Sequence, residues 1–286
     1  MPNPTTSPLI SPEELAGRLG DASLRVADVR WYLGKPGRGR EIYEAGHLPG
    51  AIFVDLDAVL AAHDGPGRHP LPSPADFARR LGELGIGDEH EVVAYDDAGG
   101  SVAARLWWML DNLGHGVVRL LDGGYPTWVA AGLPIDTEWP SYPRSTLNLS
   151  PSWGRVIDRD GLRTQLGSVT LLDARAGERY RGEVEPVDPL PGHIPTAVSA
   201  PSLGNLGPDG RLLPPETLLE RYRALGATDG TAITSCGSGI TACLNALAIR
   251  VAGLPDPILY PGSYSDWSSS GEPVATGPEP GDRPAS

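Results

Sequence analysis

The sequence predicts an α/β protein built from two tandem copies of one domain, each a mainly parallel sheet flanked by helices. Three observations support this prediction. The chain repeats itself about halfway along, predicted strands and helices alternate in both halves, and 286 residues suffice for two separate hydrophobic cores.

Three pairs of segments establish the repeat. They keep the same order in both halves, and the members of each pair lie roughly 140 residues apart. Chance similarity would not preserve both order and spacing over three blocks. The pairs are "LRVADVR" with "VTLLDAR", "AGHLPGAIFVDL" with "PGHIPTAVSAPS", and "LDGGYPTWVAAGLPI" with "YPGSYSDWSSSGEPV".

The first half alternates between strand-like and helix-like segments. Ser11, followed by a proline and two glutamates, caps a short helix, and Ser73 caps a longer one. Short runs rich in Val, Leu and Ile predict the buried strands of a parallel sheet. In chain order, the predicted strands are 24–29, 51–56, 91–97 and 116–124, and the longer helices are 73–85 and 101–114.

The second half repeats this order, with strands at 170–175, 196–201, 231–235 and 256–262 and helices at 214–226 and 241–253. The stretch between the halves is rich in Pro and Ser and has no periodicity, so it predicts a linker. The end of the chain has the composition of a disordered tail. The predicted boundaries are therefore a first domain at 8–138, a linker at 139–153, a second domain at 154–275 and a tail at 276–286.

Composition limits the possible partners and the location of the protein. The formal net charge of −13 argues against nucleic acid or an acidic membrane surface as a partner. No apolar run is long enough to span a bilayer, and the start of the chain lacks the features of a secretory signal. Two cysteines form no disulfide framework, which favours a reducing cytoplasm. The histidines show no metal-ligand spacing, so we expect neither a metal nor another cofactor.

Cys236 has an unusual place in the sequence. It lies between the predicted strand 231–235 and the following helix, where parallel α/β sheets bind their ligands. Gly237 and Gly239 allow successive N–H groups to turn inward as a nest, and the N-terminus of the helix reinforces it. Such a nest stabilises a thiolate or a persulfide anion. We therefore predict that Cys236 is a reactive nucleophile.

Other interpretations of this loop fit the residues less well. Cys243 lies among apolar residues of the predicted helix, which indicates packing, and a disulfide with Cys236 would need local unwinding. A cysteine-dependent phosphatase would close its loop with an arginine six residues after the cysteine, where this chain has Ala242. The Gly-x-Ser-x-Gly motif of a serine hydrolase is absent.

The sequence resembles the tandem rhodanese-like sulfurtransferases over nearly its whole length. The resemblance rests on "GHLPG" and "GHIPT", on "DVRWYLG" and "DARAGERYRG", on the "CGSGITA" loop and on "GSYSDW". The loop looks like the signature of the 3-mercaptopyruvate sulfurtransferases. Thiosulfate-preferring relatives typically carry Arg and Lys directly after the cysteine, where this chain has Gly237 and Ser238.

The resemblance implies binding residues in the second domain. Arg179 matches the arginine that binds the substrate carboxylate, a task that suits a planar bidentate donor. Many members carry a second arginine further on, but residues 183–190 contain none, which leaves the donor preference open. The N–H groups of the loop would hold the persulfide; these binding residues are Gly237, Gly239, Ile240 and Thr241.

The resemblance also implies an acid/base relay, in which Ser238 is linked to His69 and Asp57 from the first half. His63 is a weaker candidate for the histidine. In the first half, Ala98 aligns with Cys236 without gaps, and Asp97 is the nearest alternative. Neither residue can carry sulfane sulfur, so the first domain is expected to be catalytically silent.

The predicted reaction is covalent transfer of sulfur from 3-mercaptopyruvate, through a persulfide on Cys236, to a thiol or to cyanide, with release of pyruvate. Two alternatives remain: a thiosulfate:cyanide sulfurtransferase and a non-catalytic rhodanese-like binding module. Thioredoxin is one possible acceptor among several. A chain that already pairs two domains is expected to be a monomer.

Overall fold

The computed structural model describes residues 7–228 and 231–284. They form two compact units. The first contains the described residues up to Ala62, together with Pro72–Gly154 and Gly207–Leu212. The second contains His63–Leu71, Arg155–Leu206 and the described residues from Leu213 onward. The segment His63–Leu71 thus comes from the first half of the sequence but belongs to the second unit.

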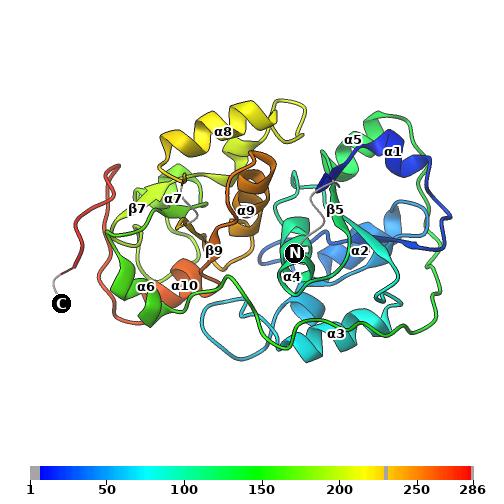
Figure 1. The fold of residues 1–286 in the computed structure, drawn as a ribbon, viewed down its shortest axis with the longest axis horizontal. Coiled ribbons are helices and arrows are strands. Elements are labelled where there is room, and N and C mark those ends of the chain that lie inside the picture. Colours follow the sequence, from blue (N-terminus) through cyan, green and yellow to red (C-terminus); the bar gives the residue numbers. More distant parts are fainter. Residues whose placement is uncertain (1–6, 229–230, 285–286) are drawn as a thin grey trace. The chain divides into compact units, whose positions relative to one another are not determined.

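The first unit, blue to green in Figure 1, contains a sheet in which all neighbouring strands are parallel, in the order β1-β5-β4-β2-β3. Its strands are β1 (Leu9–Ile10), β2 (Leu24–Asp28), β3 (Ile52–Phe53), β4 (Glu91–Tyr95) and β5 (Val118–Leu121). Its helices are α1 (Pro12–Ala16), α2 (Arg38–Ala45), the π-helix η1 (Leu56–Leu60), α3 (Pro74–Glu83), α4 (Ala103–Asn112) and α5 (Gly124–Ala130).

The second unit contains a parallel sheet in the order β7-β6-β8-β9, which repeats the order β3-β2-β4-β5 of the first unit. Its strands are β6 (Leu171–Asp173), β7 (Ala197–Ser199), β8 (Ile233–Ser235) and β9 (Ile258–Leu259). Its helices are α6 (Arg159–Gln165), α7 (Gly177–Tyr180), the 3-10 helix η2 (Ser202–Asn205), α8 (Pro215–Ala224), α9 (Ala242–Val251) and α10 (Ser263–Ser269). The α/β class and the duplication predicted from the sequence are confirmed.

Local signals in the sequence explain where several elements begin. The side chain of Ser11 accepts a hydrogen bond from Glu14 N at the start of α1. Ser73 accepts one from Asp76 N at the start of α3. Both helices also carry a proline in their first turn, as the two capping patterns predict.

The repeat extends to the buried polar contacts. Arg30 in the first unit pairs with Asp28 and donates to Gly46 O at 2.7 Å. Arg175 in the second unit pairs with Asp173 and donates to the equivalent carbonyl, Gly192 O, also at 2.7 Å. These arginines satisfy buried acidic and carbonyl groups at the ends of the central strands. Arg175 therefore has a structural role, as Arg30 has in the first unit.

Each unit has its own hydrophobic core, anchored by one tryptophan at the same place in the repeat. Trp128 and Trp267 are fully buried, and each indole N–H donates to a proline carbonyl at 2.8 Å, that of Pro134 and that of Pro273 respectively. Burying a large aromatic side chain removes much apolar surface from water, while the indole N–H keeps a partner.

Two segments, the linker and the tail, lie outside the regular elements. Residues 139–153 contain no helix or strand, and Trp153 stacks on Trp108 of the first unit. The disorder predicted for the tail at 276–286 stays a prediction. Gly277 N donates to Arg181 O, and Pro280 O accepts from Thr196 N. These two backbone hydrogen bonds join Gly277 and Pro280 to the second unit.

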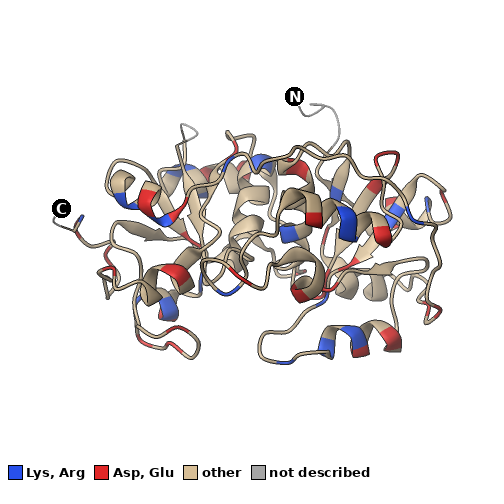
Figure 2. Cartoon of the chain, turned by 90° about the horizontal axis from the view of Figure 1, so that it is seen from below, with Lys and Arg blue, Asp and Glu red and all other residues tan. Residues whose placement is uncertain are grey.

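Charged residues of both signs are interspersed along both units, as Figure 2 shows. Many of the described arginines form ion pairs with carboxylates that are close to them in the sequence. Arg79 with Glu83, four residues apart on α3, is an example. Among the described residues, no helix combines the length and hydrophobicity that crossing a membrane requires.

Candidate active site

The Cys236 loop connects the end of β8 to the start of α9, as the sequence predicted. Cys236 is 2% exposed. Its backbone is held from two sides: Cys236 N donates to Ser263 Oγ at 3.0 Å, and Cys236 O accepts from Tyr264 N at 2.9 Å. Both partners lie at the start of α10, so the loop after β9 fixes the cysteine.

The N–H groups of the loop turn toward the sulfur. Gly239 N lies 3.1 Å from Cys236 Sγ and Ser238 N lies 3.4 Å from it. Gly239 has a φ of +74°, a conformation that glycine adopts without strain. Ile240 and Thr241 complete the turn into α9, and their carbonyls accept from Cys243 N and Leu244 N. The loop therefore forms an anion-stabilising nest around the sulfur, at the N-terminus of a ten-residue helix.

Gly237 serves the loop in a different way from the one predicted. Its φ is not in the left-handed region, so it does not supply unusual backbone freedom. Instead, a β-carbon at this position would lie 2.8 Å from Arg68 Nη2 and 3.6 Å from Arg179 Nη1. The absence of a side chain lets two guanidinium groups approach the loop.

The structure brings two of the predicted relay residues together. His69 Nδ1 lies 2.8 Å from Ser238 Oγ, and both side chains are buried. His69 reaches the loop because the segment His63–Leu71 belongs to the second unit. An imidazole hydrogen-bonded to a hydroxyl can carry a proton to or from a reacting group nearby.

Asp57, the third predicted member of the relay, lies on η1 of the first unit. Its carboxylate accepts a hydrogen bond from Trp31 Nε1 at 2.9 Å. Trp31 thus orients the carboxylate. The participation of Asp57 in a relay with His69 and Ser238 stays a prediction.

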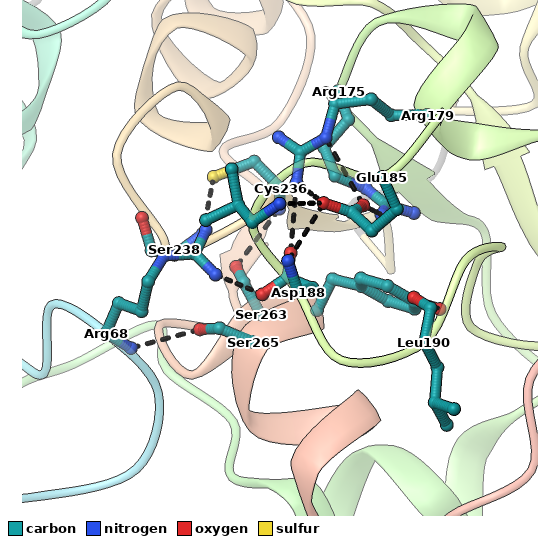
Figure 3. A network of polar contacts seen from close by, with 12 residues as sticks. Arg68, Arg175, Arg179, Glu185, Asp188, Leu190, Cys236, Ser238, Ser263 and Ser265 are labelled. Carbon is teal, nitrogen blue, oxygen red and sulfur yellow. Dashed lines mark hydrogen bonds and ion pairs between the residues drawn. The ribbon is translucent and has the colours of Figure 1, made fainter. Parts of the chain in front are cut away.

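Arg179 is tied to two carboxylates. It contacts Glu185 through Nη2 at 2.8 Å and through Nε at 3.3 Å, and its Nη2 lies 3.0 Å from Asp188 Oδ2. The segment 183–190, which lacks the second arginine of many relatives, therefore supplies two acidic partners. Figure 3 shows these side chains converging beside the Cys236 loop.

Arg68 is a site residue that the sequence did not reveal, like its partner Asp188. Its Nη1 donates to Asp188 Oδ1, and its backbone N donates to Ser265 Oγ at 3.0 Å (Figure 3). The only signal in the sequence was its position next to His69. Its partner Asp188 lies 120 residues further along the chain, a contact that only the fold defines.

The two carboxylates of this cluster respond differently to their surroundings. Burial by itself would raise the pKa of Glu185, but hydrogen bonds from Arg179 and from the N–H groups of Asp188 and Val187 lower it below its usual value. Burial raises the pKa of Asp188, although the charge of Arg68 opposes the rise. Glu185 is thus the more firmly ionised of the two carboxylates.

Cys243 has the packing role that the sequence suggested. It is fully buried on α9, and its Sγ donates to Gly239 O at 3.4 Å. Neither cysteine is in a disulfide. Among the residues that the structure describes, no group of three or more His, Cys, Asp or Glu side chains forms a metal site.

The equivalent loop of the first unit corrects the alignment made from the sequence. Tyr95 pairs with Asp28 in the first sheet, as Ser235 pairs with Asp173 in the second. Asp96, which follows Tyr95, is therefore the counterpart of Cys236, rather than Ala98 or Asp97. The backbone contacts agree, because Asp96 O accepts from Tyr125 N as Cys236 O accepts from Tyr264 N.

Comparison with known proteins identifies the class to which this fold and loop belong. The rhodanese-like domain model matches residues 11–131 and 159–270. The chain belongs to the rhodanese-like family and contains two copies of its domain.

Individual relatives span almost the same length. A Pseudomonas aeruginosa protein named "Probable 3-mercaptopyruvate sulfurtransferase" is 45% identical over 96% of this chain and 99% of that protein. A mouse thiosulfate sulfurtransferase is 37% identical over 88% of this chain and 87% of that protein. The solved structure of 3-mercaptopyruvate sulfurtransferase from Leishmania major matches with a TM-score of 0.82 and 30% identity, covering 94% of this chain and 76% of that one.

Proposed function

We propose that this protein is a sulfurtransferase that takes sulfur from 3-mercaptopyruvate and passes it on through a persulfide on Cys236. The family and the names of its relatives support the sulfurtransferase class. The observation that carries the proposal is the geometry at Cys236, whose sulfur faces two N–H donors beside the His69–Ser238 pair. The basic residues that typify thiosulfate-preferring loops are absent from positions 237 and 238.

The first half-reaction forms a bond between Cys236 Sγ and the substrate sulfur. The carbon–sulfur bond of mercaptopyruvate breaks, and its electron pair leaves as the enolate of pyruvate. The enolate takes up one proton, and the hydrogen bond between His69 and Ser238 supports that pair as its source. The substrate's thiol proton leaves the new persulfide, whose anion is stabilised by the N–H groups of Ser238 and Gly239.

The second half-reaction removes the outer sulfur. A thiolate or cyanide attacks it, the sulfur–sulfur bond breaks, and the Cys236 thiolate returns. The products are the acceptor's persulfide or thiocyanate. This cycle requires a small-molecule donor and an acceptor but no cofactor. Thioredoxin as acceptor, a monomeric chain and a cytoplasmic location stay predictions from the sequence.

The test is a side-by-side assay of 3-mercaptopyruvate and thiosulfate with cyanide as acceptor, following pyruvate and thiocyanate. We expect a higher kcat/KM with mercaptopyruvate. Intact-protein mass spectrometry after donor treatment without acceptor should show one added sulfur atom on Cys236. A preference for thiosulfate would replace the proposed donor, and no turnover with either donor would favour a non-catalytic binding module.

A further inference from the structure

Ser265, a buried residue on α10 of the second unit, contacts two parts of the active site at once. Its backbone N donates to the carbonyl of Gly237, in the loop that carries the nucleophile, at 2.9 Å. Its Oγ accepts from the backbone N of Arg68 at 3.0 Å, as Figure 3 shows. Arg68 belongs to the segment His63–Leu71, which we call the strap. Ser265 therefore joins the nucleophile loop to the strap.

The strap lies directly against the start of α10. Gly67 has a φ of +78°, and a β-carbon at its position would lie 2.5 Å from Gly262 O and 2.9 Å from Ser265 Oγ. The backbone of the strap can approach this closely only because Gly67 has no side chain. The hydroxyl of Ser265 also donates to Gly262 O at 3.1 Å, so its hydrogen points to the helix and its lone pairs are left for the strap.

The two contacts of Ser265 flank the pair of residues that would move the proton. The residue after Arg68 is His69, and the residue after Gly237 is Ser238. His69 Nδ1 lies 2.8 Å from Ser238 Oγ. Each partner of this hydrogen bond is thus one residue away from a backbone group that Ser265 fixes. Proton transfer depends steeply on the separation and alignment of its partners, so a residue that fixes both backbones controls the rate.

The first unit has a different residue at the equivalent position. Tyr125 N donates to the carbonyl of Asp96 as Tyr264 N donates to that of Cys236, so the next residue, Pro126, is the counterpart of Ser265. Proline has neither a backbone N–H nor a hydroxyl, and it can make neither of the two contacts. The two contacts therefore belong to the unit that carries the nucleophile.

We propose that Ser265 is a positioning residue that holds His69 against Ser238, and that it speeds the first half-reaction through this pair. This inference rests on the proposed function, because the enolate of pyruvate is the group that takes up the proton. The second half-reaction needs no such proton: cyanide attacks the outer sulfur, the sulfur–sulfur bond breaks, and its electron pair stays on the Cys236 thiolate. Ser265 therefore acts on the formation of the persulfide and not on its discharge to cyanide.

Single-turnover kinetics of the whole chain measure the two half-reactions separately. Ser265→Ala removes the acceptor of the Arg68 N–H but keeps the N–H that binds Gly237 O. Pyruvate formation at saturating mercaptopyruvate should become about ten- to one-hundred-fold slower. Release of thiocyanate from the preformed persulfide should keep its wild-type rate, and Ser265→Thr, which retains a hydroxyl, should recover part of the loss. Equal losses in both half-reactions, or a change in KM alone, would contradict the proposal.

A double-mutant cycle tests whether Ser265 acts through the histidine. In a His69→Ala background, Ser265→Ala should slow pyruvate formation by less than about two-fold, because the group that it positions is already absent. A further loss as large as that in the wild-type background would show that Ser265 acts through another group. Ser268→Ala is the matched control. Ser268 is buried on the same helix, its Oγ has no hydrogen-bond partner among the described residues, and its loss should leave both rates unchanged.

A spectroscopic measurement separates this inference from the proposed function. In protein with ¹⁵N-labelled histidine, the imidazole signals that His69→Ala removes belong to His69. Ser265→Ala should shift these signals toward those of a solvent-exposed imidazole, whereas Ser268→Ala should leave them in place. If the wild type forms no pyruvate but the signals shift, the proposed function fails and the positioning of His69 by Ser265 stands. If the signals do not shift in Ser265→Ala, the positioning role is wrong, whatever the activity of the wild type.

Discussion

The two units place different groups in the same backbone nest. In the first, Asp96 is fully buried and its carboxylate accepts four backbone N–H groups, those of Ala98 and Gly100 on Oδ1 and those of Val102 and Ala103 on Oδ2. In the second, the nest surrounds Cys236 Sγ with the N–H groups of Ser238 and Gly239.

The difference shows what the repeat provides and what one side chain adds. The parallel sheet and the following helix produce inward-facing N–H groups in both halves, with an aspartate after the strand in one and a cysteine in the other. In the first unit a fixed carboxylate occupies them, so that nest has no capacity for a sulfur anion. In the second, the same backbone surrounds a sulfur atom that can accept and release another sulfur.

The largest expected effect comes from removing that sulfur. We predict that Cys236→Ser lowers sulfur transfer by at least about one-thousand-fold, because a hydroxyl cannot hold sulfane sulfur. Cys243→Ala should retain most of the activity, because Cys243 is buried on α9, where its Sγ donates to Gly239 O. Steady-state assays with mercaptopyruvate and cyanide check both variants. Equal losses in the two would contradict the assignment of Cys236 as the nucleophile.

The next effect is on stability and concerns the first unit. Asp96→Asn should lower the free energy of unfolding by about 2–5 kcal/mol, because the amide NH₂ would face two of the four buried N–H donors. Denaturant titration measures the loss, and Asp160→Asn, at an exposed position, is the control. The folded fraction of Asp96→Asn should still form the Cys236 persulfide. A stable but inactive Asp96 variant would show that this carboxylate takes part in the reaction.

Features that depend on neighbouring residues in the chain could be predicted from the sequence. The hydrophobic runs defined the central strands, and the hydroxyl–proline patterns at Ser11 and Ser73 marked helix starts. Cys236 could be placed at the end of a strand because predicted strands and helices alternate regularly on both sides of it. These signals are local, so one sequence contains them.

Features that join distant parts of the chain could not be predicted in the same way. The counterpart of Cys236 was misplaced by two residues, and one of the two arises because the loop from Asp96 to α4 is one residue longer than the loop from Cys236 to α9. Sheet register, rather than residue count, determines the equivalence. Arg68 was missed because its role depends on Asp188, and only folding brings those two residues together.

The smallest expected effect concerns Ser263, the first residue of α10, a position at which the two units carry different residues. Its counterpart in the repeat is Gly124, and both residues have left-handed backbone, with φ values of +53° and +61°. A serine in this conformation costs about 1 kcal/mol relative to glycine. The hydrogen bond that its Oγ accepts from the N–H of Cys236 at 3.0 Å offsets this cost.

Two substitutions at this position separate backbone strain from the hydrogen bond. Ser263→Gly and Ser263→Ala both remove the acceptor, so both should lower kcat by a similar factor of a few-fold, because the nucleophile is less firmly held. Ser263→Gly should be the more stable of the two by about 1 kcal/mol, because only glycine relieves the left-handed conformation. Thermal unfolding and steady-state kinetics of both variants give these values. Equal stability of the two would mean that the second unit holds its serine at this position without strain, and that the difference from Gly124 reflects the hydrogen bond alone.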